Sequence, residues 1–72
     1  MMLNELGRKL KWMYEKAPKG EKVAMIHLFG IEYANEIKKY SIKDIVNAAN
    51  MPKSYGTEVA KGVHLSRFVS IK

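Results

Sequence analysis

The chain has 72 residues, of which 47% are hydrophobic and 28% charged, with a formal net charge of +6 and no cysteine. This length and composition predict one domain over residues 1–72 with a thin core, and they exclude a disordered chain and a two-domain enzyme. The lack of cysteine excludes disulfides, thiolate zinc sites and thiol nucleophiles, and it fits a reducing, cytoplasmic setting.

Residues 2–16 are predicted to form the first helix, which a loop at Pro18 and Gly20 ends. Its apolar positions recur at three- and four-residue steps, the spacing of one helical face: Leu3, Leu6, Leu10, Met13 and Tyr14. Trp12 falls off this face. We expect its ring either to be covered by the C-terminal tail or to form part of an interface.

Residues 21–39 are predicted to form a second helical stretch that is apolar almost all round in its middle, which is typical of a buried helix. Gly30 lies on its main apolar stripe. It either lets another helix approach closely, or it ends one helix and begins another. His27 lies in the apolar run and is interpreted as a core or half-buried histidine. Neither it nor the isolated His64 has an acidic residue at the spacing of a metal site, so we assign no metal.

Residues 42–49 are predicted to form a short helix that Ser41 and Asp44 begin in the manner of a capping box. Asn50 and Pro52 end it, because asparagine tolerates the left-handed backbone and proline cannot continue a helix. Proline is also well placed to start the next helix.

That next helix is predicted over residues 53–61, with Gly62 as its end. In the tail, residues 63–72, apolar and polar side chains alternate in part, which indicates a short strand or an extended tail packed on the helices. The predicted fold class is therefore all-α, a small bundle of four to five helices.

The segment from Ile42 to Val59 resembles the helix-turn-helix motif of bacterial DNA-binding proteins. The residues at the motif's buried apolar positions are Ile45, Ala49, Met51 and Val59. Asn50 stands at the turn position that glycine usually takes. Two positions depart from the motif: Gly56 replaces a bulky buried residue of the second helix, and Val46 replaces a small residue of the first. With these departures, the alternative is a helix-turn-helix-like fold whose groove-reading role is lost or altered.

The wider chain is similar to a group of small bacterial proteins described only as having a helix-turn-helix-like domain. The residues that carry this similarity lie at 14–20, 26–31 and 54–58. The similarity implies a fold and no established activity.

The motif resemblance implies a module that binds double-stranded DNA, with transcriptional regulation as one expected role. The positive charge supports this, because residues 37–72 carry seven basic and two acidic side chains. The alternative is that this charge serves only solubility. A single module offers little contact area, so a homodimer or a protein partner is expected.

The expected roles follow from the motif. Lys43, Lys53 and Lys61 would contact phosphates, while Lys38, Lys39, Arg67 and Lys72 are flanking candidates. Ser54, Tyr55 and Thr57 would contact base edges or sugars. Glu58 would face a cytosine amino group or a neighbouring lysine. Tyr55 is either exposed, in support of binding, or buried in the space that Gly56 leaves.

The alternative function is a protein-interaction or assembly domain without nucleic-acid binding, which Trp12, the thin core and the imperfect second helix favour. We expect no enzyme activity and no cofactor. The chain has no glycine-rich phosphate loop, no paired carboxylates in an apolar setting and no serine beside a plausible base. No membrane partner is expected either, because the longest apolar run, residues 23–31, is too short to cross a bilayer and no signal-peptide pattern precedes it.

Overall fold

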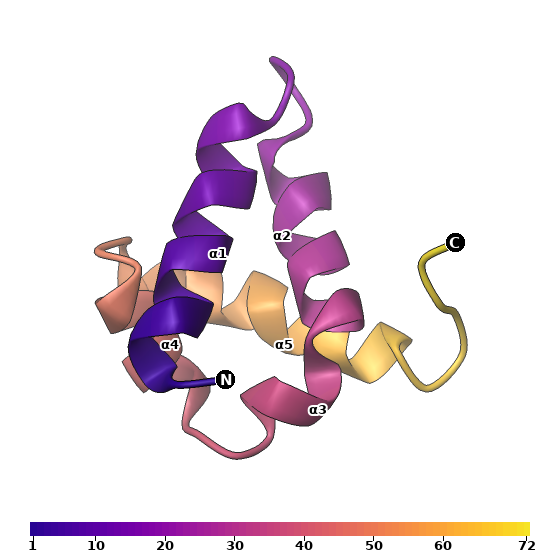
Figure 1. The fold of residues 1–72 in the computed structure, drawn as a ribbon. Coiled ribbons are helices and arrows are strands. Elements are labelled where there is room, and N and C mark those ends of the chain that lie inside the picture. Colours follow the sequence, from indigo (N-terminus) through magenta and orange to yellow (C-terminus); the bar gives the residue numbers. More distant parts are fainter.

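Figure 1 shows the computed structural model, which describes residues 1–72 and is all-helical. Its elements are α1 (Leu3–Lys16), α2 (Lys22–Glu32), α3 (Ala34–Ile37), α4 (Ile42–Ala48), the 3-10 turn η1 (Lys53–Tyr55) and α5 (Gly56–Leu65). Helices α1 and α2 form an antiparallel hairpin, α5 crosses α2, and α4 packs against α1. The five α-helices confirm the predicted fold class.

Helix α1 buries the predicted stripe and begins one residue later than predicted. Leu6, Leu10 and Met13 are buried in the core. The Glu5 carboxylate accepts the Met2 backbone N–H at 2.8 Å, which satisfies one of the donors that a helix start leaves unpaired. Because Gly7 has no side chain, the backbone of Ala48 in α4 approaches closely: a Cβ on Gly7 would lie 2.7 Å from the Ala48 carbonyl carbon.

Helix α2 is less buried than its apolar composition predicts. Ile26 and Phe29 are fully buried, but the side chains of Val23 and Leu28 are 46% and 37% exposed. The prediction of a buried helix is therefore wrong for one face. Helix α2 has α1 and α5 as its main neighbours, and they cover only part of its circumference.

Gly30 provides a close helix contact, the first of the two predicted alternatives. A Cβ on Gly30 would lie 2.6 Å from the Val59 carbonyl oxygen and 2.7 Å from Gly62 Cα of α5. The helical stretch is nevertheless interrupted, at Tyr33 and not at Gly30, so that α3 follows as a separate helix.

Helix α4 begins where the sequence predicts and ends one residue earlier, at Ala48. The Ser41 hydroxyl accepts the Asp44 backbone N–H at 3.0 Å and caps the helix. Asn50 has a φ of 59°, the left-handed conformation. The Met51 N–H then donates to the Val46 carbonyl at 3.2 Å and closes the turn.

The last helix differs from the prediction at both ends: residues 53–55 form the 3-10 turn η1, and α5 begins at Gly56. Gly62 does not end the last helix, because α5 continues to Leu65 and Gly62 is buried within it against the His27 carbonyl of α2. Of the two alternatives predicted for the tail, the strand is absent, and residues 69–72 have no regular secondary structure. Residues 66–68 form a turn, closed by the Phe68 N–H donating to the Leu65 carbonyl at 2.9 Å. A short strand has no neighbouring strand here with which to share backbone hydrogen bonds.

Side chains from every α-helix meet in one apolar cluster. Its largest fully buried members are Phe29, Leu6, Leu10, Ile26, Ile37, Ile45, Val46 and Val59. None of the helices is both long and apolar enough to cross a membrane.

Candidate nucleic-acid interface

Helices α4 and α5 meet across the turn at Asn50–Pro52 as two short, separate helices. The apolar residues predicted to hold them together, Ile45, Ala49, Met51 and Val59, are all buried. The two departures from the motif are accommodated locally. Val46 is also buried, and the position of Gly56 is partly filled by Ile42, whose Cγ2 would lie 3.5 Å from a Cβ there.

The N-terminal end of the motif's second helix, formed by η1 and the start of α5, is open to solvent. Lys53 and Ser54 of η1 and Thr57 of α5 are exposed, and Lys61 is exposed one turn further along α5. Because Val59 and Gly62 are buried, the helical period places Thr57 and Lys61 on the outward face of α5.

Lys43 of α4 is brought together with Lys53 by the turn. Both line a surface hollow of about 400 Å³, together with Asp44, Asn47 and Met51. The hollow therefore carries two cations, one carboxylate and one amide. Arg67 does not join this group, because it lies beyond the C-terminal end of α5, where its guanidinium carbon is 5.8 Å from the centre of the Phe68 ring.

Glu58 is engaged within the protein. One carboxylate oxygen lies 2.7 Å from His27 Nε2 and the other lies 3.5 Å from Lys61 Nζ, and its side chain is 24% exposed. The hydrogen bond with His27 lowers the pKa of Glu58 below its usual value, and Lys61 adds to this effect. The neighbouring lysine expected beside Glu58 is thus Lys61. His27 is half-buried, as the sequence predicts.

Tyr55 is half-buried and packs against the α1–α2 hairpin. Its hydroxyl lies 3.0 Å from the hydroxyl of Tyr14, and the two ring centres are 5.3 Å apart. This hydrogen bond, followed by the charge interaction with Tyr14, raises the pKa of Tyr55. The Tyr55 hydroxyl thus joins η1 to α1, while the neighbouring side chains of Lys53 and Ser54 stay exposed.

Sequence reasoning missed two residues of this surface. Asn47 lines the hollow with Lys43 and Lys53. His64 lines a second hollow of about 460 Å³ on α5, with His27, Thr57, Ala60, Lys61 and Leu65. The three- and four-residue steps from Thr57 through Lys61 to His64 are the signal that would have found His64. No group of three or more His, Cys, Asp or Glu side chains is placed to hold a metal ion.

Comparison with known proteins agrees with this geometry. Residues 2–72 match the model of a family described as an HTH-like domain. No curated protein and no solved structure gives a significant match. Since the family model spans nearly the whole sequence, the chain belongs to the HTH-like domain family.

Proposed function

We propose that the protein is a binding module for double-stranded DNA, with transcriptional regulation as its role in the cytoplasm. The observation that carries the proposal is the solvent exposure of η1 and of the N-terminal end of α5. Lys53, Ser54 and Thr57 are exposed beside a turn whose apolar residues are all buried, which is the arrangement that a helix-turn-helix unit needs to enter a major groove.

The proposed contacts divide into two kinds. Lys43, Lys53 and Lys61 pair with phosphates and position the module, which makes the affinity depend on salt. Ser54 and Thr57, with Asn47 of α4, have the donors and acceptors to reach base edges or sugars. Glu58 contributes indirectly: its bond with His27 ties α5 to α2.

A single module of this size binds weakly, so we propose that it acts as a homodimer or with a protein partner. Two copies related by a two-fold axis would present their second helices to half-sites one turn of DNA apart.

The test is binding of a labelled random-sequence duplex, followed by fluorescence anisotropy over a series of salt concentrations. The affinity of the wild type is expected to fall steeply with salt. Lys53→Glu is expected to weaken binding about tenfold or more at low salt and to reduce the salt slope by about one. Lys19→Glu, in the exposed loop between α1 and α2, makes the same charge change away from the turn and is the matched control.

Two outcomes oppose the proposal. The first is the absence of duplex binding at low salt. The second is an equal loss of affinity in Lys53→Glu and Lys19→Glu, which would show that only net charge matters.

A protein-interaction module is the second candidate, and one observation favours it. The C-terminal segment exposes four large apolar side chains within seven residues: Leu65, Phe68, Val69 and Ile71. Exposed apolar side chains gathered in this way mark interaction sites. Two results together would favour this function over the first. In sedimentation the wild type would form a dimer that Phe68→Ser abolishes, and the wild type would not bind duplex DNA.

A further inference from the structure

Trp12 is the only tryptophan of the chain, and it is 58% exposed on the outer face of α1. The expectation that the C-terminal tail covers it is therefore wrong. The opposite face of α1 is the buried one, with Leu6 and Leu10 in the core. Packing within the chain does not explain why so large an aromatic side chain is kept in water.

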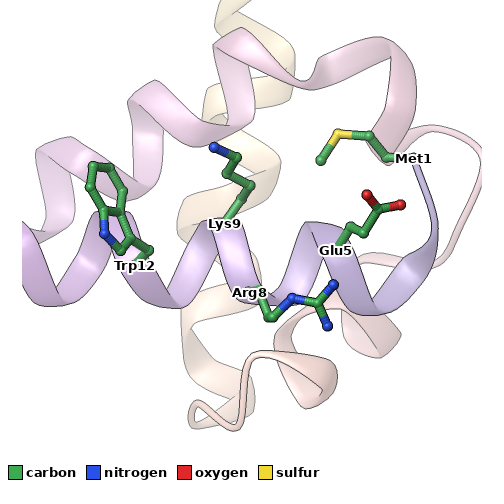
Figure 2. A pocket seen from close by; sticks show the side chains of 5 residues that line it. All are labelled: Met1, Glu5, Arg8, Lys9 and Trp12. Atoms are coloured by element: carbon green, nitrogen blue, oxygen red, sulfur yellow. The ribbon is translucent and has the colours of Figure 1, made fainter.

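One cation lies near the indole, and two more stand one helical turn away along α1. Trp12 lines a surface hollow of about 350 Å³ with Met1, Glu5, Arg8 and Lys9. Figure 2 shows Lys9 and Trp12 projecting from the same side of α1, and Lys9 Nζ lies 6.0 Å from the centre of the indole ring. Arg8 and Lys16 stand four residues before and after Trp12, so that one cation lies about one helical turn away on either side.

The carboxylates near this surface are already engaged. Glu5 accepts the Met2 backbone N–H at 2.8 Å. Glu15 lies 3.9 Å from Lys11 Nζ. The four residues Arg8, Lys9, Trp12 and Lys16, which we call the α1 stripe, therefore present an aromatic face among cations that have no carboxylate partner within 4 Å.

This chemistry fits an unpaired nucleobase better than a protein surface. The centre of a protein interface is apolar and depleted of charge, whereas the only other hydrophobic side chain in the hollow is Met1. A base stacks on an indole ring, and the phosphates on either side of it require cations. The bases of an intact duplex are stacked on one another, so the strand must be single.

We propose that the α1 stripe binds single-stranded nucleic acid, with one base stacked on Trp12 and the flanking phosphates paired with Arg8, Lys9 and Lys16. This surface lies on a different helix from the proposed duplex interface of α4 and α5. It depends on neither Lys53 nor the turn at Asn50, so the two proposals stand or fall separately.

The indole itself reports on the binding, because its fluorescence is the only tryptophan signal of the protein. Oligothymidylate added at low salt is expected to quench this fluorescence to saturation, and added salt to reverse the effect. Arg8→Glu is expected to weaken the binding about tenfold or more, while Lys53→Glu leaves it within about twofold. Lys19→Glu controls for net charge.

Stacking is separated from charge by a second measurement. With labelled oligothymidylate and anisotropy as the readout, Trp12→Ala is expected to lose about tenfold or more in affinity, and Trp12→Phe to lose less. Because Trp12 is exposed, these variants are expected to keep the circular dichroism spectrum of the wild type.

Four results would overturn the proposal. The first is that oligothymidylate does not quench the Trp12 fluorescence, and the second is that inorganic polyphosphate quenches it equally. The third is that Lys53→Glu and Arg8→Glu weaken oligothymidylate binding equally, and the fourth is that Trp12→Ala binds oligothymidylate as tightly as the wild type. The third would show that only net charge matters, and the others would leave the indole without a stacked base.

Discussion

The hydroxyls of Tyr14 and Tyr55 lie 3.0 Å apart and join the end of α1 to the turn that begins α5. Lys22 strengthens this junction from α2, since its Nζ lies 4.6 Å from the centre of the Tyr14 ring and donates to the Tyr14 carbonyl at 3.1 Å. Tyr55 shares the turn η1 with Lys53 and Ser54. The junction therefore holds the candidate DNA-contacting residues in place from the hairpin behind them.

Tyr55→Phe is expected to lower the free energy of unfolding by about 0.5–1.5 kcal/mol, because it removes one partly buried hydrogen bond. Urea unfolding of Tyr55→Phe, Tyr14→Phe and the double variant measures the effect. The double variant is expected to lose less than the sum of the two single losses. Strictly additive losses would show that the two hydroxyls do not interact.

Gly30→Ala is expected to lower the free energy of unfolding by about 1–3 kcal/mol, because the new Cβ would overlap backbone atoms of α5. Each kcal/mol corresponds to about 4–8 °C in the melting temperature of a domain of this size. Gly56→Ala is the matched control. Its Cβ meets only side-chain carbons at ordinary distances, so it is expected to stabilise the protein by about 0.5 kcal/mol. Equal effects of the two variants on thermal unfolding would argue against the close contact.

Asn50→Gly is expected to leave the stability unchanged or slightly higher, and Asn50→Ala to lower it by about 1–2 kcal/mol. The reason is the positive φ of 59°, which alanine adopts only at a cost. Thermal unfolding of both variants measures the difference. If alanine is tolerated as well as glycine, the left-handed turn between α4 and α5 is absent in solution.

The His27–Glu58 pair predicts a loss of stability in acid. The folded-state pKa of Glu58 is lowered below its ordinary value, chiefly by the His27 hydrogen bond. Its contribution is therefore fully present above the unfolded-state pKa and is lost as the pH falls through the lower, folded-state pKa. Glu36, whose pKa the N-terminal amine lowers, adds a loss of the same sign.

Melting temperatures measured between about pH 6 and pH 3 test this linkage. Glu58→Gln is expected to be less stable than the wild type at pH 6 and to approach it at pH 3. Glu15→Gln removes an exposed carboxylate and is the control. A constant gap between wild type and Glu58→Gln across the range would contradict the linkage.

Local patterns predicted the elements whose ends are set by local chemistry. The period of Leu6, Leu10 and Met13 predicts α1, and Ser41 and Asn50 bound α4 through their own backbone and side-chain preferences. The exposure of Lys53 and Thr57 follows from the same patterns, since the buried helix-turn-helix positions leave these residues outside.

Features that depend on contacts between distant elements were not predicted. Helices often end at a glycine. Gly62 instead lies within α5, where its missing side chain lets the backbone of α2 approach closely. The pairing of His27 with Glu58 depends on where α5 crosses α2, and no sequence spacing encodes that crossing. Val23 and Leu28 are exposed because α1 and α5, the main neighbours of α2, leave its second face uncovered.

The α4–turn–α5 unit is the proposed contact surface for duplex DNA. The most direct test is the change in backbone amide chemical shifts when a short duplex is added to isotopically labelled protein. We expect the largest changes to fall within residues 43–61 and to include Lys53, Ser54 and Thr57. Changes confined to α1, or to the tail beyond Leu65, would contradict it.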